Sequence, residues 1–195
     1  MFDIDVIKTR RSTRKFRPEQ LAQQDLHKIL EAAIYAPSGH NNQPWHFTVL
    51  QDKQLIDAIS DKTKSIMTKS TLEKQVNIGK SQNYHVLHNA PTVVIVSGNT
   101  KAKSPIQLPT MSIPSYSPLA DCAAAITTLM FAAHALDIGS CWIGYIQYYF
   151  ALPEAKQVLQ IPEDFQPLFA VCLGYKETAN LAAPARKTDV VTYLR

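Results

Sequence analysis

The sequence has only three cysteines, at positions 122, 141 and 172, among 195 residues. Their number is odd and none of them belongs to a Cys-x-x-Cys pair, so neither a disulfide framework nor a zinc knuckle is expected. The sequence also shows no internal repeat and no Rossmann fingerprint. This cysteine usage is typical of a protein of the reducing cytoplasm.

Signals for membranes and nucleic acids are equally scarce. The N-terminus, MFDID, has acidic residues where a signal peptide needs basic ones, and no apolar run reaches the roughly 18 residues of a membrane span. The formal net charge is +4, but lysines and arginines are scattered, and no run alternates them with aromatic residues. We expect a soluble, cytoplasmic protein that binds neither membranes nor nucleic acid. The mild basic excess suits a small anionic ligand.

The composition is that of a folded chain, with 46% hydrophobic and 18% charged residues. This length can bury a substantial core, so we expect residues 1–195 to form one domain, or one protomer of an intertwined dimer. Residues 119–136 are apolar nearly all round, which indicates a helix buried on several sides, such as one at the centre of a dimer.

Hydrophobic spacing predicts alternating helices and strands and therefore an α+β fold. A helix is expected to start near Pro18 and to end at Pro37, and short helices are expected at 53–60 and 153–160. Strands are expected at 45–50, 92–97 and 166–175, with a strand or turn at 139–145. Residues 61–84 are ambiguous and residues 101–118 contain four prolines, so a flap or lid is possible within 61–118.

A basic cluster near the N-terminus is the first candidate site. In the stretch TRRSTRKF, Arg10, Arg11 and Arg14 surround the hydroxyl of Ser12. Guanidinium groups pair well with phosphate oxygens, although a solvated basic helix end would show the same pattern. The pair Arg186 and Lys187 could complete a phosphate site from the other end of the chain, or could belong to a polar tail.

A loop rich in amides is the second candidate. In APSGHNNQPWHF, Ser38, Asn41 and Gln43 can donate to and accept from the edge of a planar heterocycle, and Gly39 allows close backbone approach. An ordinary turn between a helix and a strand is the alternative.

These motifs resemble those of the FMN-dependent nitroreductases, in the same order and over essentially the whole chain. The matching stretches are RRSTRKF at 10–16, PSGHNNQPW at 37–45, HNAPTVVIV at 88–96, DCAAA at 121–125, AAHALDIGSCWIG at 132–144, LGYK at 173–176 and PARK at 184–187. The resemblance implies a nitroreductase-like fold, with a central mixed or antiparallel sheet flanked by helices. It also implies an intertwined homodimer with FMN in the subunit interface.

The resemblance also implies residue roles. The phosphate and ribityl chain would be held by Arg10, Arg11, Ser12 and Arg14, with Arg186 and Lys187 completing the phosphate site. The other subunit would contribute a loop with Pro37, Ser38, Asn41 and Gln43. The amide of Asn83 would contact the isoalloxazine, and backbone groups would approach the flavin ring from Cys141, Trp142, Ile143 and Gly144.

The implied activity is reduction of nitroaromatics, quinones or similar electron-poor small molecules by NADH or NADPH, in two-electron ping-pong steps. The chemistry would occur at flavin N5, with no catalytic side chain and no metal. Some family members carry a glutamate where this chain has Ile143. We expect Cys141 to pack without a redox role, and His85 and His88 to be a surface pair. A non-catalytic flavin-storage or sensing module is the alternative function.

Overall fold

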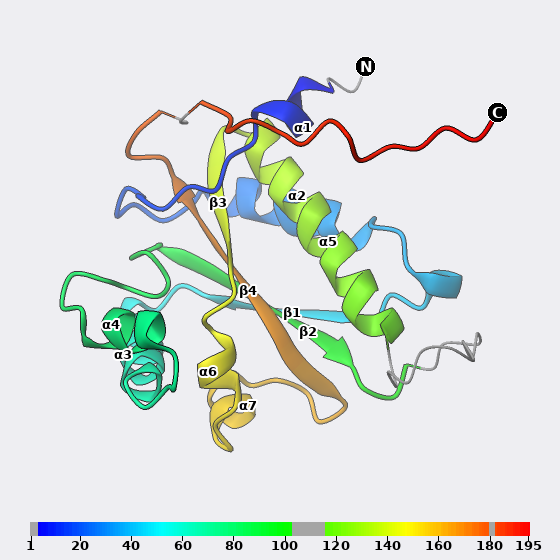
Figure 1. Ribbon diagram of the computed structural model, residues 1–195. Coiled ribbons are helices and arrows are strands. Elements are labelled where there is room, and N and C mark those ends of the chain that lie inside the picture. Colours follow the sequence, from blue (N-terminus) through cyan, green and yellow to red (C-terminus); the bar gives the residue numbers. More distant parts are fainter. Residues whose placement is uncertain (1–3, 103–115, 180–181) are drawn as a thin grey trace.

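A four-stranded antiparallel sheet forms the centre of the molecule (Figure 1). The structure is a computed structural model that describes residues 4–102, 116–179 and 182–195. The strands are β1 (Trp45–Leu50), β2 (Thr92–Asn99), β3 (Ile138–Ile143) and β4 (Phe165–Tyr175), arranged in the order β1-β2-β4-β3. All three neighbouring pairs are antiparallel, and the predicted α+β class is confirmed.

Helices cover both faces of this sheet, which explains why β2 is apolar along most of its length. Val94 and Val96 belong to a cluster with α2 (Gln23–Ile34) and α5 (Tyr116–Ala135), whereas Val93 and Ile95 belong to a second cluster on the opposite face. Side chains alternate between faces along a strand, so β2 contributes side chains to both core clusters.

The second face is covered by helices that connect the strands. They are α3 (Lys53–Met67), α6 (Gln147–Phe150) and α7 (Ala155–Val158), while α4 (Glu73–Lys80) packs on α3 and α1 (Asp5–Thr9) lies near the N-terminus. Asp52 caps α3, since its carboxylate accepts hydrogen bonds from the backbone N–H groups of Gln54 (2.8 Å) and Leu55 (3.3 Å).

Several predicted boundaries were wrong. The helix expected at 53–60 continues to Met67, because Thr63 and Met67 extend its buried face. The helix expected to start near Pro18 begins at Gln23, and the one expected at 153–160 is reduced to Ala155–Val158. The possible flap at 61–118 contains the end of α3, all of α4 and β2, and the start of α5; its residues 103–115 lie outside the described part of the chain.

Helix α5 is the longest element of the described chain. By length and composition alone, its stretch Pro118–Ala135 could cross a membrane, contrary to the expectation that no apolar run reaches that length. Within this stretch 44% of the residues are buried, and Cys122, Ile126 and Leu129 are fully enclosed between the sheet and α2. Packing in a protein core accounts for this apolar composition.

The turn before β2 contains two histidines that are half-buried, so the expected surface pair was wrong. His85 accepts hydrogen bonds at Nδ1 from the backbone N–H groups of Leu87 (3.2 Å) and Asn89 (3.1 Å), and its Nε2 lies 3.3 Å from a carboxylate oxygen of Asp57. Burial, followed by the charges of Arg14 and His85, lowers the pKa of His88 to about 4.

This shift predicts a loss of stability in mild acid. The unfolded chain takes up a proton at His88 near pH 6.5, whereas the folded chain does so only near pH 4. The free energy of unfolding should therefore decrease as the pH falls through this window, by up to about 2 kcal/mol at pH 5 from this residue. His88→Asn should reduce the difference between urea unfolding at pH 7.5 and at pH 5, because asparagine does not titrate and tolerates the positive φ of 53° at this position.

The exposed His27 on α2 provides the control. His27→Asn should leave the pH dependence as in the wild type. An undiminished pH dependence in His88→Asn would show that the acid sensitivity arises elsewhere.

Candidate functional site

A cavity of about 730 Å³ lies between residues 10–15 and residues 178–179 and 182–186. The structure thus brings together Arg10, Arg11, Ser12, Arg14 and Arg186, which come from distant parts of the sequence. Lys187 is not among the lining residues. The cavity is lined by Arg10, Arg11, Ser12, Thr13, Arg14, Lys15, Thr178, Ala179, Ala182, Pro184 and Arg186.

Backbone pairing with the sheet positions the basic segment. The strand β3 is at the edge of the sheet, and Ser12 forms a parallel bridge with Ser140, where the Thr13 N–H donates to the Ser140 carbonyl at 2.9 Å. Further along, the Arg17 N–H donates to the Tyr175 carbonyl at 2.9 Å. From Ser12 onward the segment is therefore attached to the sheet. Arg10 is the C-cap residue of α1, and Nη1 of Arg11 donates to the Lys8 carbonyl in the last turn of α1 at 2.7 Å, so the alternative interpretation, a basic helix end, holds for these two arginines.

Gly139 makes this close approach possible. A Cβ atom at this position would lie 2.7–2.9 Å from the side-chain atoms of Thr13, closer than real Cβ contacts. The sequence offered no sign of this role, because Gly139 and Thr13 are far apart in the chain.

The cavity carries positive charge without compensation from its lining residues, none of which is acidic. Nη1 of Arg10 and Nε of Arg11 are buried and have no hydrogen-bond partner in the described structure. Burial, followed by the charge of Arg11 and then of Arg186, lowers the pKa of Arg10 from its ordinary value, against an opposing effect of Cys141. Buried donors of this kind are costly unless an acceptor reaches them, so this donor set fits a phosphate group.

The residues expected to approach a flavin ring lie on β3 and at its end. Cys141 and Ile143 are buried among the side chains of the second core cluster, whereas Trp142 points to the opposite face and packs edge-on against Phe169, with ring centroids 4.8 Å apart. Gly144 is exposed, and a Cβ atom there would meet nothing within 4 Å. The backbone at the end of β3 is therefore accessible from solvent.

Cys141 has the environment of a packing residue. Burial raises the pKa of its thiol, although Arg14, Ser12 and Arg10 act in the opposite direction. A protonated, buried thiol is a poor nucleophile.

The amide loop is held by internal hydrogen bonds. The Ser38 hydroxyl accepts from the Gln43 N–H at 3.0 Å, and Nε2 of Gln43 donates to Oδ1 of Asn41 at 3.0 Å. His40, Asn41 and Gln43 all adopt positive φ angles, of 50°, 55° and 44°. Three such residues within four positions are unusual outside functional loops, and the side chains of Asn41 and Gln43 are exposed.

Helix α5 separates this loop, which includes Pro37 and Ser38, from the basic cavity of the same chain. The Gly39 N–H donates to Oδ1 of Asp121 at 3.1 Å near the start of α5, whereas the Thr9 hydroxyl lies 2.9 Å from Nε2 of His134 near its end. Asp121 and His134 are thirteen positions apart on α5, or about 20 Å along the helix axis. The structure does not bring the two candidate sites together within one chain.

Asp121 is a positioning residue that the sequence analysis missed. The only hint was an acidic residue in the otherwise apolar stretch LADCAAA.

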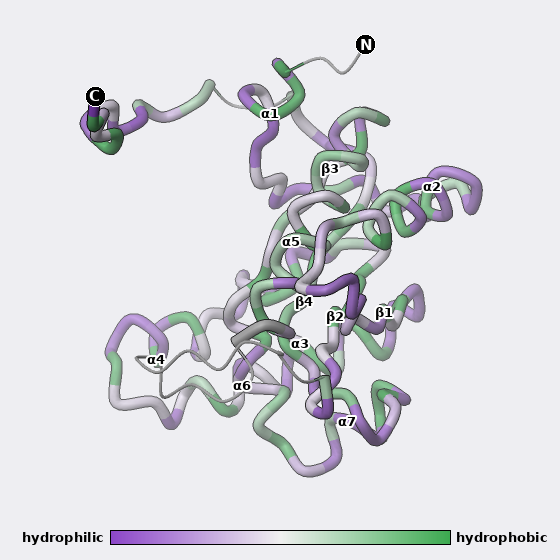
Figure 2. Tube along the Cα trace, turned by 90° about the vertical axis from the view of Figure 1, so that its right-hand side faces the viewer, coloured by the Kyte–Doolittle hydropathy of each residue, from purple (hydrophilic) through white to green (hydrophobic). Residues whose placement is uncertain are grey.

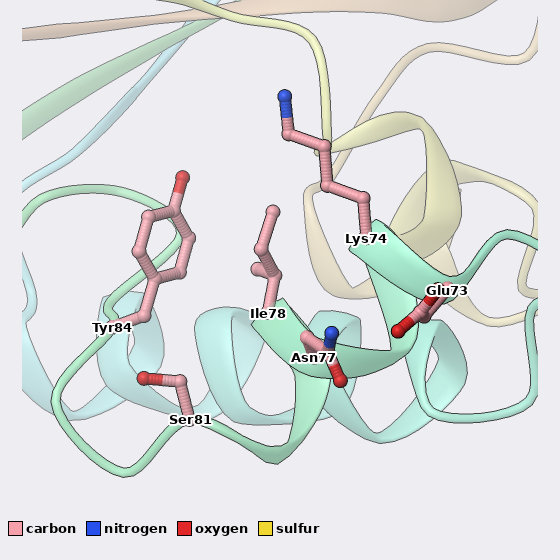
Figure 3. A pocket seen from close by; sticks show the side chains of 6 residues that line it. All are labelled: Glu73, Lys74, Asn77, Ile78, Ser81 and Tyr84. Carbon is pink, nitrogen blue, oxygen red and sulfur yellow. The ribbon is translucent and has the colours of Figure 1, made fainter.

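A second cavity, of about 470 Å³, is present between α4 and the turn that follows it (Figure 3). It is lined by Glu73, Lys74, Asn77, Ile78, Ser81 and Tyr84. Asn83, expected from its spacing to contact a flavin, lies exposed in this turn and lines neither cavity. Among the described residues there is no group of three potential metal ligands.

Comparisons with known proteins agree with this geometry. The model of the nitroreductase family matches residues 7–175. A protein of Archaeoglobus fulgidus with the provisional name NADH dehydrogenase/NAD(P)H nitroreductase is 31% identical over 88% of this chain and 84% of its own. The crystal structure of a Bacteroides fragilis nitroreductase with bound FMN has a TM-score of 0.83 and 33% identity, covering 98% of both chains. An FMN-bound nitroreductase from Desulfitobacterium hafniense has a TM-score of 0.82 and 27% identity over 100% of both chains.

The family match covers most of the chain, and the structural similarity extends over nearly its whole length. The resemblance inferred from the motifs is confirmed, and so is the nitroreductase-like fold. This chain belongs to the nitroreductase family.

Proposed function

We propose that this protein is an FMN-dependent oxidoreductase that uses NADH or NADPH to reduce nitroaromatics, quinones or similar electron-poor small molecules in alternating two-electron half-reactions. The observation that carries the proposal is the basic cavity, where buried arginine nitrogens lack partners in the described structure. Membership of the nitroreductase family and the FMN-bound structures of its relatives support a flavin oxidoreductase.

The cavity residues would bind the cofactor through its phosphate. Arg10, Arg11 and Arg186 provide charge-assisted donors, Ser12 provides a hydroxyl, and Arg14 extends the positive surface toward β3. Lys187, next to the lining residue Arg186, would add positive charge at the rim. When bound, FMN supplies the redox chemistry by accepting a hydride from a reduced nicotinamide and passing two electrons to the acceptor.

The protein would orient the cofactor and would provide no general acid. The thiol of Cys141 is buried, and burial raises its pKa, so water is the better proton source. The exposed end of β3 at Gly144 leaves room for a substrate to approach. We assign Trp142 and Ile143 a backbone role, because the side chain of Trp142 packs against the opposite core cluster.

The active unit would be a homodimer. The amide loop lies too far along α5 to reach the basic cavity of its own chain, so a two-fold related partner would contribute Pro37, Ser38, Asn41 and Gln43 to each site. We propose that Asn83 contacts the ring from the same chain as the cavity.

The C-terminal segment supports this assembly. Figure 2 shows residues 182–195 extending away from the body of the molecule. Its apolar side chains are largely exposed: Val190 is 70%, Val191 62%, Tyr193 74% and Leu194 95% accessible. Such a segment is unfavourable in water and favourable against a second subunit.

We also propose a cytoplasmic location. All three cysteines are free and buried, as expected for a chain that folds in a reducing compartment.

The proposed activity predicts turnover with flavin in place. Protein loaded with FMN should oxidise NADH or NADPH in the presence of menadione or nitrofurazone, measured as the loss of absorbance of the reduced nicotinamide. A protein that binds FMN but turns over with neither acceptor would instead be a flavin-storage or sensing module.

The basic cavity predicts a specific loss of FMN affinity in Arg10→Ala. This change removes hydrogen bonds to a charged group, each worth about 1.5–3 kcal/mol, so the Kd for FMN should rise about ten- to a hundred-fold. Fluorescence titration of flavin-free protein would measure it. Arg17→Ala is the matched control, because Arg17 is exposed and does not line the cavity. Equal effects of the two changes would exclude a specific phosphate contact.

The shared site predicts complementation between two defective chains. Arg10→Ala and Gln43→Ala homodimers should both bind FMN weakly. A heterodimer formed from one chain of each kind has one site with both defects and one site with neither, so it should bind one FMN with wild-type affinity. Calorimetry on purified heterodimers, made with two different affinity tags, would count this site. If each chain built its own site, no heterodimer site would be intact and tight binding would not return.

A further inference from the structure

The cavity beside α4, which we call the α4 cavity, shares no lining residue with the basic cavity. Figure 3 shows that the ammonium group of Lys74, the side chain of Ile78 and the hydroxyl of Tyr84 point to the same side, whereas the carboxylate of Glu73 is turned away from Lys74. Within the described part of the chain, Lys74 forms no ion pair or side-chain hydrogen bond. The α4 cavity thus combines one unpaired cation, a hydroxyl and an apolar surface.

The position of α4 is fixed by contacts at two points. A Cβ atom on Gly79 would lie 2.7 Å from the carbonyl oxygen of Lys64 and 2.8 Å from the backbone nitrogen of Thr68, so glycine lets α4 lie directly against the end of α3. On another side of α4, Oε1 of Gln75 accepts hydrogen bonds from the hydroxyls of Ser70 and Tyr148, the latter on α6. The α4 cavity therefore has defined walls before any ligand binds.

Tyr84 connects the α4 cavity with the second core cluster. Its ring packs edge-on against His88, with centroids 6.0 Å apart, and it borders the core cluster that contains Cys141. Burial, with smaller effects of Tyr145 and Cys141, raises the pKa of Tyr84, and the charge of Arg14 opposes this rise. Arg14 also lines the basic cavity, so its charge acts on both regions.

We propose that the α4 cavity binds the electron acceptor and favours an aromatic acceptor that carries a carboxylate group. Lys74 pairs with the carboxylate, the Tyr84 hydroxyl donates a second hydrogen bond, and Ile78 contacts the ring. This inference names the substrate class of the oxidoreductase proposed above and rests on that function.

The size of the cavity and the single cation of Lys74, with the Glu73 carboxylate turned away from it, favour this ligand over the phosphate of a nicotinamide dinucleotide. About 470 Å³ is within the usual range for small-molecule sites and accommodates a single substituted ring. One lysine balances one carboxylate, whereas proteins usually recognise a dianionic phosphate with several cationic or backbone donors, as the basic cavity does.

Isothermal calorimetry on FMN-loaded protein without reductant tests the proposal directly. The probes are 4-nitrobenzoate and 4-nitrobenzamide, which have similar shapes but differ in charge. Lys74→Gln should raise the Kd for nitrobenzoate about tenfold and leave the Kd for nitrobenzamide unchanged. Tyr84→Phe should weaken nitrobenzoate binding by a smaller factor. Lys80→Gln is the matched control: it removes the same charge from the same helix at a residue outside the cavity lining, and it should change neither Kd.

Three results would overturn the proposal. Wild-type protein that binds nitrobenzoate no more tightly than nitrobenzamide would remove the carboxylate preference. Equal losses in Lys74→Gln and Lys80→Gln would reduce the effect to general surface charge. If Lys74→Gln slowed anaerobic flavin reduction by NADPH but not by NADH, with nitrobenzoate binding unchanged, the cavity would hold the phosphate of the reductant.

Binding measured without turnover separates this proposal from the proposed function. Protein that binds nitrobenzoate through Lys74 but oxidises neither NADH nor NADPH would support the carboxylate site and contradict the oxidoreductase activity. Wild-type protein that oxidises NADH or NADPH but binds nitrobenzamide more tightly than nitrobenzoate would support the oxidoreductase activity and contradict the carboxylate site.

Discussion

The arrangement of the molecule depends on the rigid length of α5. This helix packs against the sheet and α2, and each of its ends is tied to a different candidate site: Asp121 to the amide loop and His134 to the segment that precedes the basic cavity. A buried helix cannot shorten, so the two sites remain about 20 Å apart in one chain. In the proposed homodimer, a symmetric partner would bring the amide loop of one chain to the basic cavity of the other, and α5 would set the spacing between the two sites.

The basic cavity and the amide loop both contain local features that lower the stability of the folded chain. In the basic cavity, buried nitrogens of Arg10 and Arg11 lack partners in the described structure, and in the amide loop three of the four positions 40–43 have positive φ. Such features cost free energy in the isolated chain and are typical of sites that a ligand or partner completes. Elsewhere, β2 and α3 follow ordinary rules of burial and capping.

In the proposed function, the cofactor and the protein have different roles. FMN would supply the reaction, while the chain would determine what is bound, through charges attached to rigid elements. The basic segment follows the edge strand β3, and α4 is held against α3 by Gly79. Loops positioned by such a framework can differ among proteins without changing the fold.

Strong local patterns in the sequence were sufficient to predict the main strands and the long helix. The strand Trp45–Leu50 was predicted with the correct bounds, because its β-branched and aromatic residues lie between clear turn signals. The region from 61 to 84 was not, because amphipathic signals there are weak and α4 depends on contacts with α3 and α6.

The sequence by itself determined the family and the chemical character of the candidate site, since arginines and amides at fixed spacings carry that information whatever the fold. Only the tertiary structure decided that Arg186 joins Arg10 while Lys187 lies outside the cavity lining, and that Asp121 holds the amide loop far from both arginines. It alone revealed the α4 cavity. These relations join residues far apart in the chain, and their distances arise from packing, which no local pattern encodes.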